Sequence, residues 1–404
     1  MSDAVPPPAS RVTRILVGRA LRAFADGYVS LLLPFYLTAC GHTPLEIGVL
    51  VTATLLGSGV LTLLTGYVAH RYHARTMLLA AAWLMTATGI AFSGVTAFWP
   101  LLIVAFVGTM NPSSGDVSIF LPLEQAMLAH AVAARERTAV FARYSLLGAL
   151  AGAGGAQAAI LPHWMEHLGI APLTAMQLMF VLYAAFGVAI LFLYRDLDAP
   201  RSGEAPSAQP LTTSRSTVYR LAALFSLDSF AGGFAVQSLL ALWLSQRYGA
   251  GLDTTATVFF WVGLLSAFSQ LVSPRLASRI GLVNTMVYTH LPANLFLIAV
   301  PFMPTFPLAM ACLFARSALS QMDVPARTSY VMAVVSPAER AAAASVTAVP
   351  RSLAAAISPG IAGYLLAWSP FGAPLIVCGA LKIVYDLLLL HMFSRVKPPE
   401  EGRS

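Results

Sequence analysis

Charged residues are scarce in this sequence. Only 10% of its 404 residues are Asp, Glu, Lys or Arg, whereas 58% are hydrophobic. A soluble domain usually carries about 25% charged residues. So little charge cannot cover a surface that faces water, and the chain needs an apolar solvent such as a lipid bilayer. We therefore expect an integral membrane protein.

Cysteine and recognisable ligand patterns are also scarce. Cys40, Cys312 and Cys378 are odd in number and far apart, which fits neither a disulfide framework nor a metal site. His163 and His167 are four residues apart, but no third ligand is near them in the sequence. We find no nucleotide-binding P-loop and expect no cleavable signal peptide. The sequence therefore predicts no metal, no cofactor and no catalytic residues.

Apolar runs of about 20 residues, the length of a transmembrane helix, recur along the chain. The proline in MNPSSGD (110–116) predicts a kink in the fourth of these runs, because proline removes a helical hydrogen bond. We predict twelve spans, at residues 13–37, 45–69, 76–96, 99–131, 138–161, 174–194, 219–246, 254–274, 282–303, 306–335, 341–367 and 372–395.

The net charge of +7 indicates a membrane orientation rather than a nucleic-acid partner. If the N-terminus is cytoplasmic, Arg247 is the one basic residue in the expected outer loops, as the positive-inside rule requires. We expect a multi-pass protein of the cell (inner) membrane with both termini in the cytoplasm. The basic residues on the inner side would be Arg11, Arg14, Arg71, Arg75, Arg135, Arg137, Arg195, Arg201, Arg215, Arg220, Arg275, Arg279, Arg340, Arg395, Lys397 and Arg403.

One long polar segment interrupts the apolar pattern. Residues 196–217 are rich in Pro, Ser, Ala and Gly, which is typical of a flexible linker, and they separate the spans six and six. We predict an N-terminal six-helix bundle (1–195), a cytoplasmic linker (196–218) and a C-terminal six-helix bundle (219–404). The fold class is all-α, with two like-facing bundles related by an axis along the membrane normal.

The two halves share a sequence frame. LRAFADGY (21–28) returns about 206 residues later as LDSFAGGF (227–234), so that L-x-x-F-A-x-G-aromatic is kept. The charges are not kept, because Arg22 corresponds to Asp228 and Asp26 corresponds to Gly232. Three looser matches follow in the same order, which favours duplication of a six-helix unit.

The loop after the second span carries a further motif. It reads GYVAHRYHAR (66–75), and together with the six-plus-six architecture it resembles the major facilitator superfamily (MFS) of secondary transporters. The family pattern there is about G-x-x-x-D-R-x-G-R-K/R, which Gly66, Arg71 and Arg75 fit. His70 replaces the aspartate, and His73 replaces the second glycine. The resemblance implies alternating access but names no substrate. His70 could bring pH sensitivity or be an exposed residue without a special role.

Twelve charged residues fall inside the predicted spans, where a charge normally faces a bundle interior or an aqueous cavity. Three pairs have i, i+4 spacing and share a helix face: Arg22 with Asp26, Asp323 with Arg327, and Lys382 with Asp386. The acids are Asp26, Asp116, Glu124, Asp228, Asp323 and Asp386, and the bases are Arg22, Arg143, Arg316, Arg327, Arg351 and Lys382.

Depth makes Asp26 the leading candidate for a proton-binding or substrate-binding group. At about 1.5 Å per residue it lies near the midplane of the first span, whereas Arg22 lies closer to the cytoplasm. A fixed Arg22–Asp26 pair that only orients the helix is the alternative. The other candidates for these roles are Arg22, Asp116, Glu124, Asp228 and Asp323.

Arginines and aromatic residues supply the remaining candidates. Arg143 and Arg351 occupy matching places in the two halves, and with Arg327 they could clamp an anion. Alternatively they form gates, in which Asp116 or Glu124 pairs with Arg143 and Asp323 pairs with Arg351. Tyr28 and Phe234 lie beside the repeated charged frame and could stack on a substrate in a cavity, or simply pack.

These observations predict a monomeric secondary transporter in the bilayer that moves a small-molecule solute and is coupled to protons. Export of an amphiphilic or toxic compound by antiport is the first form of this hypothesis. Import or exchange of an organic or inorganic anion through paired arginines is the second. A membrane enzyme or receptor is a remote third, since no nucleophile, metal or signalling domain is evident.

Overall fold

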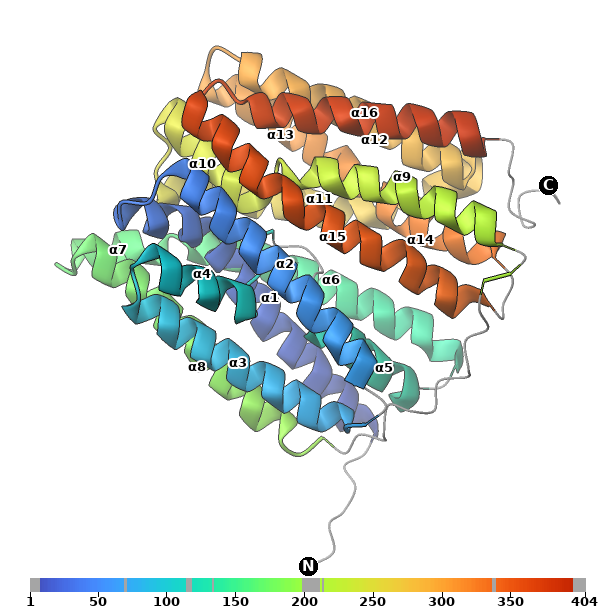
Figure 1. Cartoon of the computed structure of the whole chain (residues 1–404), viewed down its shortest axis with the longest axis horizontal. Helices are drawn as coiled ribbons and strands as arrows, with labels where there is room; N and C mark the ends of the chain where they lie inside the picture. Colours follow the sequence, from blue (N-terminus) through green and yellow to red (C-terminus); the bar gives the residue numbers. More distant parts are fainter. Residues whose placement is uncertain are drawn as a thin grey trace, which may run out of the picture. The chain divides into compact units, whose positions relative to one another are not determined.

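The computed structural model describes residues 8–68, 71–113, 118–132, 134–197, 211–212, 214–335 and 339–394. Helices make up its architecture, in two compact units (Figure 1). Residues up to Ala205, with Ala250–Phe260, form the first unit, and Pro206–Gly249 with the chain from Trp261 form the second. Most of the expected linker, 198–210 and 213, lies outside the described residues, so its boundaries stay a prediction.

The first unit contains α1 (Pro8–Ala39), α2 (Pro44–Val68), α3 (Ala74–Gly94), α4 (Phe98–Val107), α5 (Phe120–Ala131), α6 (Ala134–Ala158), α7 (Leu161–His167) and α8 (Pro172–Tyr194). The second contains α9 (Arg215–Gly233), α10 (Gln237–Tyr248), most of α11 (Leu252–Ile280), α12 (Leu282–Ala299), the 3-10 helix η1 (Val300–Phe302), α13 (Phe306–Ser320), α14 (Asp323–Val334), α15 (Arg340–Trp368) and α16 (Ala373–Phe393).

The same pattern of helix contacts occurs in both units. In the first unit, α1 packs against α6 and α8, and α3 packs against α8, α4 and α5. In the second unit, α9 packs against α15 and α16, and α12 packs against α16, α13 and α14. The pairs α3–α8 and α12–α16 can be followed side by side in Figure 1. The shared pattern matches the repeat read from the sequence.

Three predicted spans consist of two helices each. The fourth is α4 followed by α5, as its proline predicts, and the tenth is α13 followed by α14. The seventh is α9 followed by α10, and this break was not predicted from the sequence. It follows Gly232 and Gly233, and glycine pays more conformational entropy in a helix than any other residue.

Eight helical segments of the described chain are long and apolar enough to cross a membrane. The other four predicted spans correspond to α1, α4 with α5, α13 with α14, and α15. The first of these carries Arg11, Arg14, Arg19, Arg22 and Asp26, and the second and third are broken into shorter helices. Within the described residues, helices thus occupy all twelve predicted spans.

The glycine of the repeated frame has a packing role in both units. A Cβ atom at Gly27 would lie 2.2 Å from the backbone oxygen of Gly152 on α6. A Cβ atom at Gly233 would lie 2.5 Å from the backbone oxygen of Ala355 on α15. Small residues let membrane helices approach this closely. The frame therefore repeats because it supports the same close helix crossing twice.

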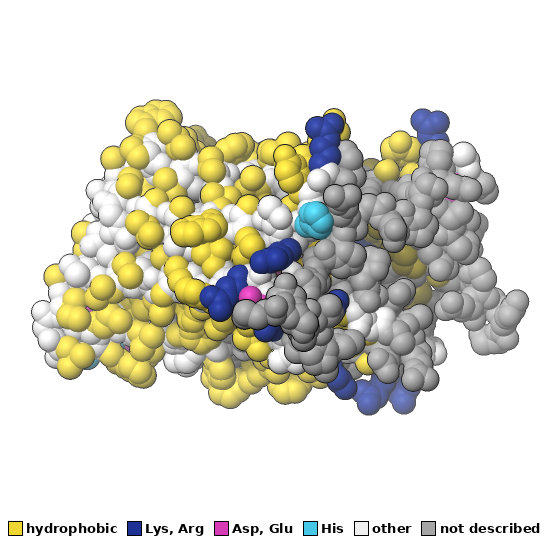
Figure 2. Space-filling view, turned by 90° about the horizontal axis from the view of Figure 1, so that it is seen from below, with side chains coloured by type: hydrophobic (Ala, Val, Ile, Leu, Met, Phe, Trp, Pro, Cys, Tyr) yellow, Lys and Arg dark blue, Asp and Glu magenta, His cyan; other side chains and the backbone are white. Residues whose placement is uncertain are grey.

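Apolar side chains dominate the outer surface. Figure 2 shows one face that is largely hydrophobic, with Lys and Arg side chains gathered toward one side of the view. Trp83 on α3 and Trp99 on α4 are 64% and 72% exposed. Exposed aromatic and aliphatic area on this scale is suited to lipid rather than to water.

A hydrogen-bonded clasp joins the beginnings of α9 and α15, outside the predicted spans. Glu339 Oε1 accepts hydrogen bonds from the backbone N and the Oγ1 of Thr212, at 2.6 and 2.8 Å. Its Oε2 accepts from the backbone N of Ser214 at 3.2 Å. These donors stabilise the carboxylate, and they lower the pKa of Glu339 to about 2.

Glu339→Gln is therefore expected to lower the melting temperature by a few degrees at neutral pH. The stabilisation is present above the ordinary pKa of 4.5 and is lost as the pH falls toward about 2. Melting curves of wild type and variant should hence converge as the pH drops below about 4.5. Glu166→Gln, an exposed site on α7, is the control. A difference in melting temperature between wild type and Glu339→Gln that stays constant with pH would show that the ionised Glu339 carboxylate does not stabilise the protein.

Candidate functional site

The first unit holds a buried ion pair around Glu124 of α5. Arg22 of α1 donates from Nη2 to Glu124 Oε2, and both side chains are buried. Tyr144 of α6 donates to the same oxygen at 2.6 Å, and Tyr194 of α8 donates to Oε1. The Arg22 guanidinium also lies over the Phe120 ring, 4.2 Å from its centroid. This carboxylate is therefore fully supplied with donors.

The ion pair corrects two pairings considered from the sequence. Arg22 pairs with Glu124 rather than with Asp26, and Glu124 does not pair with Arg143, whose side chain is exposed. The physical reason is burial, because Glu124 is 0% exposed and a buried charge requires a partner.

Asp26 lies one helical turn from Arg22 and is left without a direct partner. Within the described part of the chain it makes no hydrogen bond or ion pair, and its side chain is partly exposed. Arg22 and Arg19 attract it electrostatically. The first unit thus contains one acid with a full set of donors, Glu124, and one acid without a hydrogen-bond or ion-pair partner among the described residues, Asp26.

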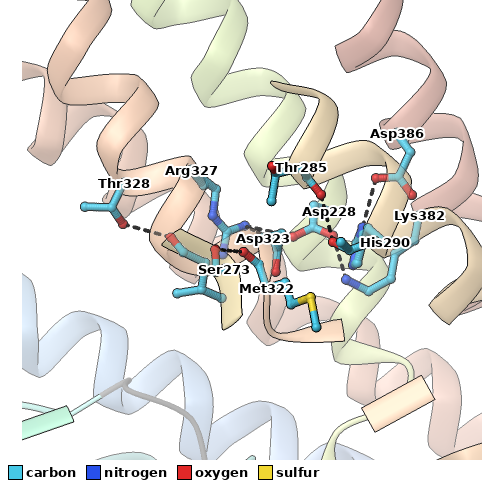
Figure 3. Close-up of polar contacts among 12 residues, drawn as sticks. Asp228, Ser273, Thr285, His290, Met322, Asp323, Arg327, Thr328, Lys382 and Asp386 are labelled. Atoms are coloured by element: carbon cyan, nitrogen blue, oxygen red, sulfur yellow. Dashed lines mark hydrogen bonds and ion pairs between the residues drawn. The ribbon is translucent and has the colours of Figure 1, made fainter. Parts of the chain in front are cut away.

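The second unit holds a larger network around Asp228 of α9 (Figure 3). Lys382 of α16 donates to Asp228 Oδ1 at 2.5 Å, and Arg327 of α14 donates to Oδ2 at 3.0 Å. Arg327 also lies 3.7 Å from Asp323, four residues earlier on the same helix. The Asp323–Arg327 pair was predicted from its spacing and is confirmed.

Asp386 belongs to the same network through different partners. It accepts from Asn294 Nδ2 at 3.0 Å, and its Oδ1 lies 2.9 Å from His290 Nδ1, both on α12. The predicted Lys382–Asp386 pair is therefore not formed, because Lys382 turns to Asp228 on α9. His290 and Asn294 were not among the residues predicted from the sequence. Their four-residue spacing inside an apolar span was the available signal.

The two units place opposite charges at corresponding positions. In the first unit α1 supplies the cation, Arg22, and α5 supplies the anion, Glu124. In the second unit α9 supplies the anion, Asp228, and α14 supplies the cation, Arg327. Both α5 and α14 follow the break in their span. The repeat thus keeps an ion pair between equivalent helices and reverses its sign.

The remaining candidates are more dispersed. Arg351 is partly exposed on α15, and Asp323 pairs with Arg327 rather than with it. Tyr28 is fully buried and donates to the Met179 carbonyl at 3.2 Å. Phe234 is 4% exposed and meets Phe230 edge to face. Asp116 lies outside the described residues. Gating and substrate stacking stay predictions for these side chains.

The loop motif is exposed where it is described. Gly66 is exposed near the C-terminal end of α2, and Arg71 and Arg75 are also exposed. His70 lies outside the described residues. No group of three His, Cys, Asp or Glu side chains in the described ranges could hold a metal ion.

Comparison with known proteins gives the family. The family model of the Major Facilitator Superfamily matches residues 15–318 and 230–404. An uncharacterized membrane protein of Saccharomyces cerevisiae, YJR124C, is 26% identical over 426 residues, which cover 96% of this chain and 95% of that protein.

Solved structures share the fold at low identity. The nucleoside transporter NupG has a TM-score of 0.71 at 14% identity, covering 95% of this chain and 99% of its own. A bacterial homolog of the human lysosomal transporter Spinster has a TM-score of 0.70 at 14% identity, covering 96% of both chains. The human organic anion transporter MFSD10 has a TM-score of 0.68 at 19% identity, covering 95% and 100%. The chain therefore belongs to the major facilitator superfamily and is a secondary transporter of small solutes, a multi-pass membrane protein and not an enzyme.

Proposed function

We propose that this transporter couples solute movement to protons and that Asp26 is the proton-binding group. One observation carries the proposal. In the described chain, Asp26 is an acid in the middle of a membrane helix that has neither an ion pair nor a hydrogen bond. Glu124, Asp228, Asp323 and Asp386 each have a cation or hydrogen-bond donors inside their own unit.

The position of Asp26 in the membrane makes its ionised form energetically unfavourable. It lies 13 residues before Ala39 at the end of α1, about 20 Å at 1.5 Å per residue. A carboxylate at the centre of a bilayer costs about 2.5–3.5 kcal/mol on insertion scales. Binding a proton removes that cost, and losing the proton restores it. A group in this position can therefore link its protonation to the conformation that exposes it.

We propose an amphiphilic solute, exported in exchange for protons. An apolar groove of about 370 Å³ runs along α1 and α6, from Thr13 to Phe24 and across to Leu147 and Ala151. Asp26 follows Phe24 by two residues, which is about 200° around the helix, so the acid and the groove lie on different faces of α1. The apolar lining of this groove suits the apolar body of such a solute. The paired-arginine clamp has less support, because Arg143 is exposed.

We also propose that both termini face the cytoplasm. The support is the basic character of the predicted inner loops, set against the single Arg247 in the predicted outer loops. Accessibility labelling of cysteines introduced at each end of the chain tests this orientation.

Asp26→Asn is expected to abolish gradient-driven accumulation and leave solute exchange in place. One pH unit supplies about 1.4 kcal/mol per proton, which can drive about tenfold accumulation. The variant should therefore fall to about onefold, because its amide cannot carry the proton. The measurement is uptake of a solute panel by everted and right-side-out vesicles, with and without a pH gradient. Glu166→Gln is the control, and full accumulation by Asp26→Asn would exclude the role.

A further inference from the structure

Arg316 on α13 is a cation at the depth of the bilayer centre. It lies ten residues after Phe306, where α13 begins, which is about 15 Å at 1.5 Å per residue. The hydrocarbon core is about 30 Å thick. A guanidinium at this depth is costly unless it is paired or lines a cavity.

No acidic side chain in the described part of the chain pairs with Arg316. Its Nε is buried without any hydrogen-bond acceptor, and no ion pair joins it to a carboxylate. The other deeply placed cations of this unit differ, because Arg327 and Lys382 both bind Asp228. Arg316 as a whole residue is partly exposed, although its Nε is buried.

The titratable group on α16 that interacts with Arg316 is a thiol rather than a carboxylate. The buried thiol of Cys378 interacts electrostatically with both Arg316 and Lys382. Lys382 lies one helical turn after Cys378 and is already bound to Asp228 at 2.5 Å. The protein thus offers Arg316 a thiol, and the carboxylate that also interacts with this thiol, Asp228, is already bound by Lys382 and Arg327.

We propose that Arg316 is an anion-binding residue, which binds a carboxylate or phosphate group of the transported solute. The planar guanidinium donates in a fork that fits both of these groups. A bound anion supplies the counter-charge that the chain lacks. The proposal rests on the proposed transport function in one respect, namely that the bound anion is part of the transported solute. The solute is then an organic anion with an apolar body.

Purified protein in nanodiscs of uncharged phosphatidylcholine allows a direct test. The readout is thermal stabilisation by matched probes, namely benzoate and phenyl phosphate, against benzamide and benzylamine. Wild type should be stabilised by the anionic probes and not by the amide or the amine. Arg316→Gln should bind those anions at least about tenfold more weakly, and Arg316→Lys should fall between, because it keeps the charge without the fork. Arg275→Gln, which removes an exposed arginine of the same unit, should bind as wild type does.

The same experiment separates the sources of the anion. Equal stabilisation by chloride or inorganic phosphate would identify a free ion as the ligand and would still support the role of Arg316. Anion binding that is seen in phosphatidylcholine nanodiscs but is lost when anionic lipid is added would identify a lipid phosphate as the competing occupant, again at Arg316. Unchanged anion binding by Arg316→Gln, or no binding of any anion by wild type, would overturn the proposal.

Two further readouts distinguish this role from others. Without ligand, Arg316→Gln should melt at or above the temperature of wild type, because it removes an unpaired charge from membrane depth. A purely structural arginine would give a lower melting temperature instead. Asp26→Asn should retain anion binding, so the failure of proton coupling and the failure of anion binding can be told apart.

Discussion

Asp228→Asn is expected to destabilise the second unit by about 3–5 kcal/mol, the usual cost of removing one member of a buried ion pair. Asp228 is 6% exposed and binds both Lys382 and Arg327. Arg327 keeps Asp323 at 3.7 Å after the substitution, but Lys382 loses the one carboxylate that it contacts in the described chain. The expected result is a strongly lowered melting temperature in detergent or poor recovery of folded protein.

A second substitution makes the reason testable. Lys382→Met in the Asp228→Asn background removes the orphaned ammonium group, and methionine matches much of the volume of the lysine stem. The double variant should regain a large part of the lost stability, since replacing a buried pair by apolar groups is often near neutral. Asp253→Asn at the beginning of α11 is the control for a less buried acid. A double variant less stable than Asp228→Asn would show that the Lys382 charge is not the source of the cost.

The sequence predicted which residues carry buried charge better than it predicted their partners. Spacing of i, i+4 correctly gave Asp323 with Arg327, because both lie on one helix. It failed for Arg22 and Lys382, whose partners lie on other helices. Spacing of i, i+4 shows that two side chains point from the same face of a helix. It does not say whether a neighbouring helix brings a closer or more deeply buried carboxylate.

The breaks in the helices show the same limit. Proline in residues 110–116 predicted the interruption between α4 and α5, since proline acts locally. The break after Gly233 was missed, although Gly232 and Gly233 stand in the printed frame, because glycine pairs also occur in intact membrane helices. Partners such as His290 and Asn294 were missed because neither carries a full charge, and only tertiary packing brings them to Asp386.

The reversed sign of the repeated ion pair leads to the second large prediction. Glu124→Gln is expected to cost about 3–5 kcal/mol, because Arg22 stays buried without its carboxylate. The reversal Arg22→Glu with Glu124→Arg should restore a substantial part of that loss. The second unit demonstrates that these helix positions accept an anion on the first helix and a cation after the break.

Full restoration is not expected, and the reason lies in the hydroxyl groups around Glu124. Tyr144 and Tyr194 donate to its two oxygens, whereas an arginine there offers them no acceptor, so that each hydroxyl must rotate toward another group. Melting temperatures of wild type, Arg22→Glu, Glu124→Arg and the reversed pair form a double-mutant cycle. This cycle isolates the coupling between the two charges. A reversed pair no more stable than the sum of its single substitutions would mean that the sign is fixed by the tyrosines. The repeat would then preserve the helix crossing at Gly27 and Gly233 but not an exchangeable ion pair.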